Sequence, residues 1–351
     1  MSSLLMNIAP VLAAIVASFL ASLVFARLAI AEMWLPDKPN ARSSHQKATT
    51  KAGGVAIGFG ASIGIGLFSI VGAFDLAVNI VAIVIVGAVV ALILGLLDDK
   101  LAPPPFAKLI MQIALAIGAV VLIGPFSTLS LPFIGDVALA PFIGAIISVF
   151  WIVGFMNAFN FMDGINGLAG GCAFVGLGFF AVAAFQGSAV GLATVSLICG
   201  ASVLGFLKLN FARGSIFLGD NGSQFLSFVI AVLALAGAAT QSVANIAFLP
   251  IVFLPIILDV AWTLIHRIRR GQPITQGHRE HNYQLLIRLG QSHQRVASMY
   301  IGATFLFALV AIASLSSPVL AYLAAIMLSA GLGALALGIY RRASAAGLLP
   351  E

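Results

Sequence analysis

Long apolar stretches, separated by short loops, most constrain how this chain can fold. Eleven stretches are recognisable, at about 5–30, 52–73, 77–97, 106–124, 141–160, 165–185, 189–209, 222–240, 243–265, 297–315 and 317–340. Each is roughly as long as the 20 residues that an α-helix needs to cross a bilayer. Only 8% of the 351 residues are charged, against about a quarter in soluble domains. The sequence therefore predicts an all-α polytopic membrane protein with about eleven transmembrane helices in a single domain, 1–351.

The distribution of basic residues predicts the orientation of these helices. All 17 Lys and Arg residues fall in alternate loops or at the adjoining helix ends, while the other loops contain only Asp75 and Asp136 as charged residues. Because Lys and Arg are enriched in cytoplasmic loops, this pattern places the N-terminus outside and the C-terminus in the cytoplasm. The net charge of +6 is scattered over short loops, so it argues against nucleic acid as a partner.

The few acidic residues gather on the same predicted cytoplasmic side. Asp98 and Asp99 leave the third stretch side by side. Adjacent carboxylates raise each other's pKa unless a cation lies between them. A divalent metal or a basic partner would relieve that repulsion, whereas a helix cap would not need two acids. The motif-bearing cytoplasmic loops are predicted at 31–52, 98–108, 157–166, 208–223 and 266–296.

A second polar group lies at the end of the fifth stretch. Asn157, Asn160 and Asp163 follow one another at three-residue spacing, so they share one face of a helix. Three polar side chains at a membrane edge are costly to desolvate unless they meet a ligand, and Gly164 allows close approach of the backbone. The alternative interpretation is a polar turn between two helices.

Two further loops carry candidate residues. Asp220 and Ser223 lie beside glycines at the start of the eighth stretch, where they act either as ligands or as a cap of that helix. In the last loop, His278 and His281 have the spacing of zinc ligands, but no third ligand follows at a suitable distance. The arginines before them could neutralise phosphates or could only determine topology.

Together these loops resemble the polyprenyl-phosphate N-acetylhexosamine-1-phosphate transferase family, which is glycosyltransferase family 4. The resemblance extends from about Arg42 to Leu286. The residues that carry it are Arg42-Ser43-Ser44-His45 with Lys51-Ala52-Gly53-Gly54, Asp98-Asp99 with Lys108 and Gln112, Asn157, Asn160 and Asp163-Gly164, Asn210, Phe217 and Gly219-Asp220 with Gly222-Ser223, and Asp259.

The chain departs from the family pattern in two places. Asn166 stands where members often have a second Asp, and the last loop retains only Arg279 and His281 of the usual Asp-Arg-x-His-x-His-His. Tyr283 and Gln284 replace two histidines, a form that resembles the O-antigen-initiating branch. This implies either drift in a loop that contacts only phosphates, or an apolar Tyr283 face that favours a 6-deoxy sugar, such as N-acetylfucosamine or N-acetylquinovosamine, over GlcNAc.

The resemblance implies a reaction and a set of site residues. A sugar-1-phosphate would pass from a UDP-sugar to undecaprenyl phosphate with release of UMP, starting O-antigen-like polysaccharide synthesis on the cytoplasmic face of a bacterial inner membrane. The cofactor would be Mg²⁺, for which Mn²⁺ could substitute. The expected catalytic residues are Asp98, Asp99 and Asp220, with Asp220 and Asn160 as metal ligands. The expected substrate-binding residues are Lys47, Lys108, Asn157, Asn160, Asp163, Asn210, Phe217, Arg279 and His281.

Two questions stay open from the sequence. A transporter or ion pathway is the alternative function, but such a protein places ionisable residues near the middle of the bilayer, and only Asp259 lies inside a predicted helix. The sequence does not fix the oligomeric state, and a homodimer is an open alternative.

Overall fold

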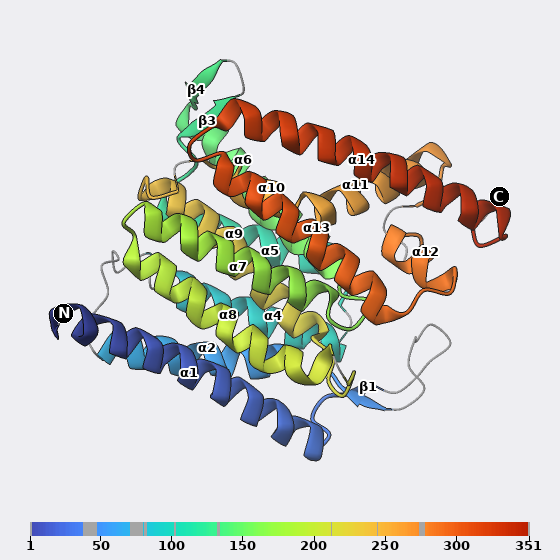
Figure 1. Ribbon diagram of the computed structural model, residues 1–351. Coiled ribbons are helices and arrows are strands. Elements are labelled where there is room, and N and C mark those ends of the chain that lie inside the picture. Colours follow the sequence, from blue (N-terminus) through green and yellow to red (C-terminus); the bar gives the residue numbers. More distant parts are fainter. Residues whose placement is uncertain are drawn as a thin grey trace.

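The computed structural model describes residues 2–37, 48–70, 80, 83–101, 103–131, 134–211, 213–243, 245–273 and 278–349. Within these residues the chain is almost entirely helical, and nine helices are long and apolar enough to cross a membrane (Figure 1). The predicted class, an all-α polytopic membrane protein, is confirmed.

The elements follow one another in a simple order. The helices are α1 (Ser2–Ala31), α2 (Gly53–Ile70), the π-helix η1 (Ile83–Gly87), α4 (Ala88–Leu101), α5 (Pro105–Ile123), α6 (Pro141–Phe161), α7 (Leu168–Gln186), α8 (Val190–Asn210), α9 (Gly219–Ala239), α10 (Phe248–Val252), α11 (Leu254–Arg269), α12 (Asn282–Arg288), α13 (His293–Ala313) and α14 (Pro318–Ala345). Two short antiparallel pairs join β1 (Pro36–Asp37) to β2 (Thr49–Thr50) and β3 (Thr128–Leu131) to β4 (Gly135–Ala138).

Two of the eleven predicted stretches differ from the nine candidate spans. In the stretch predicted at 77–97, the described residues form η1 and then α4, which continues to Leu101. The stretch predicted at 243–265 is divided between α10 and α11 at Phe253, and Pro255 lies in the first turn of α11. Proline has no N–H for a continuous helix interior, so the helix restarts there. Apolarity alone did not reveal this break.

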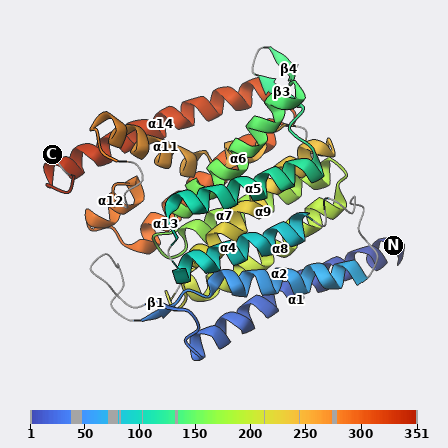
Figure 2. The same ribbon diagram turned by 180° about the vertical axis from the view of Figure 1, so that it is seen from behind.

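Helix α9 lies at the centre of the bundle, where it packs against α4, α6 and α2. Its most apolar 18-residue window is 94% buried, against 17% for that of α14. Figures 1 and 2 show α1 and α2 along one edge of the molecule and α13 and α14 along the opposite edge. The core therefore surrounds α9, and α14 presents most of its apolar surface outward.

Glycines allow the helices to approach closely at the start of α9. A Cβ atom at Gly95 would lie 2.3 Å from the carbonyl oxygen of Asp220, and one at Gly54 would lie 2.2 Å from the Cα of Gly222. Since no side chain fits at either position, α4 and α2 meet α9 backbone to backbone. This contact brings the acidic end of α4 next to Asp220.

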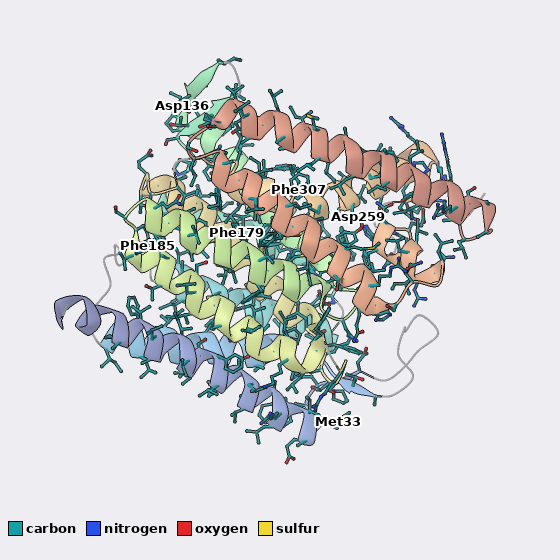
Figure 3. The ribbon with its side chains drawn as sticks, in the orientation of Figure 1. Met33, Asp136, Phe179, Phe185, Asp259 and Phe307 are labelled. Carbon is teal, nitrogen blue, oxygen red and sulfur yellow. The ribbon has the colours of Figure 1, made fainter. Side chains whose placement is uncertain are left out.

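The motif-bearing segments meet at one end of the bundle. Helix α12, strand β1 and the C-terminal end of α14 lie at this end, while the β3–β4 hairpin and the start of α1 lie at the other (Figure 1). Figure 3 shows Asp259 inside the molecule and Asp136 on that hairpin. The two termini lie at opposite ends (Figure 1). The topology, with the N-terminus outside and the C-terminus in the cytoplasm, stays a prediction from the Lys and Arg distribution.

Candidate active site

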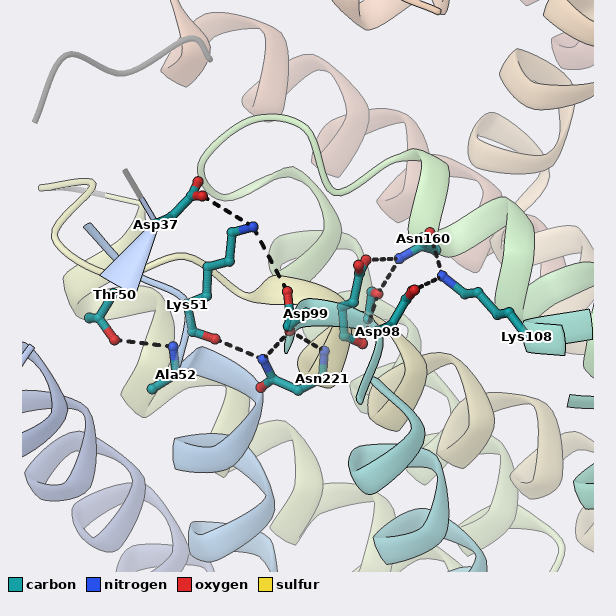
Figure 4. A network of polar contacts seen from close by, with 11 residues as sticks. Asp37, Thr50, Lys51, Ala52, Asp98, Asp99, Lys108, Asn160 and Asn221 are labelled. Atoms are coloured by element: carbon teal, nitrogen blue, oxygen red, sulfur yellow. Dashed lines mark hydrogen bonds and ion pairs between the residues drawn. The ribbon is translucent and has the colours of Figure 1, made fainter. Parts of the chain in front are cut away.

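The ends of α4 and α6 and the first turn of α9 bring the predicted polar side chains together (Figure 4). Asn160 Nδ2 donates hydrogen bonds to Asp220 Oδ1 at 2.6 Å and to Ser223 Oγ at 2.7 Å. The structure thus joins two motifs that are 60 residues apart in the chain. Asn160 faces Asp220 through its amide nitrogen, whereas its oxygen, the atom that could bind a metal, lies 3.4 Å from Lys108 Nζ.

Lys108 connects Asp98 to this network. It lies in the first turn of α5 and forms an ion pair with Asp98. The side chains of Lys108 and Asp98 are 20% and 14% exposed, so water and solutes can reach the pair. Asp98, Lys108 and Asn160 therefore lie together, as the sequence predicts for one site.

Asp99 is more buried than its neighbour Asp98. Its side chain is 4% exposed, and Oδ2 accepts hydrogen bonds from the backbone N–H of Asn221 at 3.0 Å and from Asn221 Nδ2 at 2.7 Å. Lys51 Nζ lies 3.9 Å from Asp99 Oδ1 and 3.3 Å from Asp37 Oδ1. The contacts fix Asp99 against the start of α9.

Asn221 lies beside the acidic residues, but the sequence analysis did not single it out. It is fully buried, donates from Nδ2 to the Lys51 carbonyl at 2.8 Å and accepts the Val55 N–H on Oδ1 at 3.1 Å. It therefore fastens the first turn of α9 to the start of α2 as well as to Asp99. The available signal was its place between Asp220 and Gly222, in a motif that leaves this position unspecified.

The site contains more carboxyl groups than cations. We call Asp98, Asp99, Asp163 and Asp220, with Lys51 and Lys108, the acidic cluster. Burial, followed by the nearby carboxylates of Asp220 and Asp99, raises the pKa of Asp163 well above its usual range. The Lys51 charge and the Gly219 N–H oppose this rise only in part. Carboxyls that raise one another's pKa favour a bound cation.

A magnesium ion fits the chemistry of the acidic cluster. Across the described ranges, no three His, Cys, Asp or Glu side chains converge closely enough to form a ready-made metal site. Mg²⁺ usually keeps several waters and needs only one or two carboxylates, so a third protein ligand is not required. The observation that fits the ion is the excess of carboxyl groups.

Two predicted nucleotide ligands instead connect helices and loops. Asn157 Nδ2 donates to Gln112 Oε1 at 2.7 Å, and Gln112 donates to Gln224 at 2.8 Å, which links α5, α6 and α9 beneath the site. Asn210 is 4% exposed and joins the Gly167 N–H to the Ile216 carbonyl, both at 2.7 Å. These contacts use the side-chain nitrogen of Asn157 and both polar side-chain atoms of Asn210, and nucleotide binding by the two residues stays a prediction.

The remaining predicted substrate-binding residues are Lys47, Phe217, Arg279 and His281. Lys47 is not among the described residues. Phe217 is half-buried, and its N–H donates to the Thr50 carbonyl at 2.8 Å. Arg279 is exposed at the surface, whereas His281 is 3% exposed and lies 3.7 Å from Asp259.

Tyr283 does not present an apolar face to a substrate. It is 1% exposed, and its hydroxyl donates to the Phe161 carbonyl at 3.0 Å while accepting from Gln284 Nε2 at 3.1 Å. The proposed contact between its ring and a 6-deoxy sugar therefore has no basis in this structure, because the ring is enclosed by protein.

Comparison with known proteins matches the part of the chain that forms this site. The family model for glycosyl transferase family 4 matches residues 81–238, which include the ends of α4 and α6 and α9 up to its penultimate residue, Ala238. A probable undecaprenyl-phosphate N-acetylglucosaminyl 1-phosphate transferase of Bacillus subtilis is 34% identical over 280 residues, 79% of this chain and 76% of the relative.

Two more distant relatives have similar descriptions. The decaprenyl-phosphate N-acetylglucosaminephosphotransferase of Mycobacterium leprae is 29% identical over 290 residues, covering 74% of this chain and 71% of the relative. The undecaprenyl-phosphate alpha-N-acetylglucosaminyl 1-phosphate transferase of Escherichia coli O157:H7 is 27% identical over 280 residues, covering 76% and 73%. The chain therefore belongs to glycosyl transferase family 4, and within it to the polyprenyl-phosphate N-acetylhexosamine-1-phosphate transferases. The transporter alternative is not retained.

Proposed function

We propose that this protein transfers an N-acetylhexosamine-1-phosphate, in the first instance GlcNAc-1-phosphate, from a UDP-sugar to undecaprenyl phosphate. UMP is released, and the lipid-linked sugar starts the synthesis of a cell-surface polysaccharide. The names of the three relatives support the substrates. The observation that carries the proposal is the acidic cluster at the end of an apolar bundle, where a soluble nucleotide sugar and a membrane lipid can meet.

The proposed reaction is one phosphoryl transfer. An oxygen of the lipid phosphate forms a bond to the sugar-bearing phosphorus as the bond from that phosphorus to the bridging oxygen breaks, and UMP leaves. Positioning and charge neutralisation carry most of such a reaction. Lys108 would exchange its ion pair with Asp98 for a substrate phosphate, and Asp98 would then accept the proton of the lipid phosphate. Asp99, which contacts Asn221 and Lys51, would keep α4 and α9 in their relative positions.

Mg²⁺ would bind at the acidic cluster, with Asp220 as its main protein ligand. When bound, the ion neutralises charge on the diphosphate and the departing UMP. Asp163 and Phe217 are proposed to contact the nucleotide, and exposed Arg279 a phosphate. The oligomeric state stays a prediction, and a homodimer is compatible with this function.

Release of UMP by the purified protein tests the proposal. With UDP-GlcNAc, polyprenyl phosphate and Mg²⁺, UMP is expected to appear together with a lipid-linked sugar, and omission of the lipid should abolish it. Asp136→Asn, on the distant β3–β4 hairpin, is the matched control and should keep full activity. Absence of UMP with every UDP-N-acetylhexosamine would contradict the proposal.

The site is proposed to face the cytoplasm of a bacterial cell. Ser215 lies between the end of α8 and the start of α9, which carries Asp220, and exposed Ser127 directly precedes β3, whose hairpin lies at the opposite end of the bundle (Figure 1). With the buried Cys172 and Cys199 replaced by Ala, an impermeant thiol reagent should label Ser127→Cys in intact cells and leave Ser215→Cys unlabelled. The reverse pattern would place the site outside.

A further inference from the structure

Asp259, in the middle of α11, lies in a dense set of hydrogen-bond donors. It is 4% exposed. Its Oδ1 accepts from the Asn282 N–H at 2.8 Å, from Asn282 Nδ2 at 3.1 Å and from Thr263 Oγ1 at 3.3 Å. Its Oδ2 accepts from the Tyr283 N–H at 3.4 Å and from the Tyr300 hydroxyl. We call these residues the Asp259 network.

The network caps α12 from another helix. The first N–H groups of a helix have no partner within it, and those of Asn282 and Tyr283 are directed to the Asp259 carboxylate. A cavity of about 930 Å³ between α11, α13 and α14 is lined in part by Asp259 and Asn282. The start of α12 is therefore held by hydrogen bonds to Asp259 and by the Gln284 side chain, which accepts the His281 N–H at 3.3 Å.

Helix α12 in turn contacts the loop that carries Asp163. The Tyr283 hydroxyl reaches the carbonyl of Phe161, the last residue of α6, at 3.0 Å. It also lies so close to Gly164 that a Cβ there would come within 2.0 Å of it. Asp163 lies between these two contacts and within electrostatic reach of Asp220 and Asp99. A path of contacts therefore leads from Asp259 through α12 to the loop that carries Asp163, which is a member of the acidic cluster.

We infer that Asp259 is a positioning residue for the transfer reaction, which acts by fixing α12 and, through Tyr283, the loop 161–164 beside the acidic cluster. The inference rests on the proposed function. Asp259 does not touch the reacting groups in this account. It sets the position of the loop that carries Asp163. Both of its carboxylate oxygens already accept hydrogen bonds within the Asp259 network.

The first test measures the position of α12 without any substrate. In Asp259→Asn, hydrogen exchange measured by mass spectrometry should become about tenfold faster in the segment 278–290, since hydrogen bonds to a charged group are stronger than those to a neutral one. Exchange in α9 and α13 should stay unchanged. The matched control is Asp136→Asn, the same substitution on the distant β3–β4 hairpin, and it should resemble the wild type.

Two outcomes of that test would overturn the inference. Unchanged exchange in 278–290 would show that Asp259 does not hold α12. Faster exchange throughout α13 and α14 as well would show that it stabilises the whole bundle. Neither outcome depends on turnover, so a failure of the proposed function, seen as absence of UMP from the wild-type protein, is distinguished from a failure of this inference.

The second test asks whether Asp259 acts through Tyr283. Tyr283→Phe keeps the buried ring and removes the hydroxyl that contacts Phe161. If both residues act along one path, their effects are not additive, and the double variant should have a kcat/KM within about twofold of that of Asp259→Asn alone. A loss in the double variant equal to the product of the two single losses would overturn the proposed path.

Discussion

The acidic cluster and the Asp259 network lie near the same end of the bundle, but they are built in opposite ways. In the acidic cluster four carboxyl groups are accompanied by two lysines, and Asp163 is pushed toward its protonated form. In the Asp259 network a single carboxylate receives hydrogen bonds from two backbone N–H groups and from three side chains.

This difference distinguishes a site that binds a ligand from a group of residues that stabilises the fold around it. A buried carboxylate whose acceptors are all used has little left to offer a ligand, and removing it leaves donors unpaired. A group of carboxyls with too few donors is costly until a cation arrives. The acidic cluster is therefore expected to respond to metal, and the Asp259 network to respond only to changes in the fold.

Removal of the metal should have the largest effect. EDTA should abolish UMP release, and added Mg²⁺ or Mn²⁺ should restore it, because the diphosphate charge and the acidic cluster then lack a counter-ion. Hydrogen exchange in 278–290 should not change on chelation, since the Asp259 network holds no metal. Full activity in EDTA would show that the acidic cluster does not need a bound cation.

Replacement of one carboxylate in each group should then give unequal losses. Asp220→Asn keeps the shape and removes the charge, and turnover should fall by about 10²–10³, the usual effect of deleting an electrostatic contact in a transition state. Asp259→Asn should lower kcat/KM by about tenfold, because it only displaces the supporting loop. Equal losses in the two variants, measured by UMP release, would contradict a direct role for Asp220 and an indirect one for Asp259.

The close approach of α4 and α9 should be the next most sensitive feature. Gly95→Ala gains about 1 kcal/mol of helix propensity, but the new Cβ would meet the Asp220 carbonyl at 2.3 Å. We expect a lower Tm and about a tenfold loss of turnover as the two acidic ends separate. Gly178→Ala, in α7, meets nothing within 4 Å and should be neutral or slightly stabilising. A Gly95→Ala protein that matches this control would show that the contact is not needed.

Sugar choice should show the smallest effect. Because Tyr283 is buried, Tyr283→His should leave the ratio of kcat/KM for UDP-GlcNAc and UDP-N-acetylfucosamine within about threefold of the wild-type ratio. A pocket that reads one methyl group changes such a ratio by about 10–200-fold. Competition between UDP-GlcNAc, UDP-N-acetylfucosamine and UDP-N-acetylquinovosamine measures it. A shift in the larger range would show that Tyr283 contacts the sugar after all.

The class of fold could be predicted for a clear physical reason, because long apolar stretches form helices that cross a bilayer. Such helices alternate in direction, so the loops on one side lie at one end of the bundle, and Asp98 and Asp220 were expected at the same end. Their roles in one site were implied by the resemblance to the family and stay a proposal. The divided ninth stretch could not be predicted in the same way, because the hydropathy of α10 and α11 is continuous across Phe253.

The roles of individual amides were beyond sequence reasoning. Asn160 and Asn210 have the same side chain at similar places near helix ends, yet Asn160 faces Asp220 whereas Asn210 connects Gly167 to Ile216. The spacing of residues gives the helix face but not the partner across it. Asn221 was missed for the same reason, since its contacts to Asp99 and Lys51 come from distant parts of the chain.

Binding of Mn²⁺ to the purified protein, followed by electron paramagnetic resonance without substrates, shows whether the acidic cluster holds the cation. We expect one saturable site in the wild type, retained within about threefold in affinity in Asp259→Asn and lost in Asp220→Asn. Binding that is equal in all three proteins, or that is lost only in Asp259→Asn, would contradict the claim that the acidic cluster holds the cation and the Asp259 network supports it.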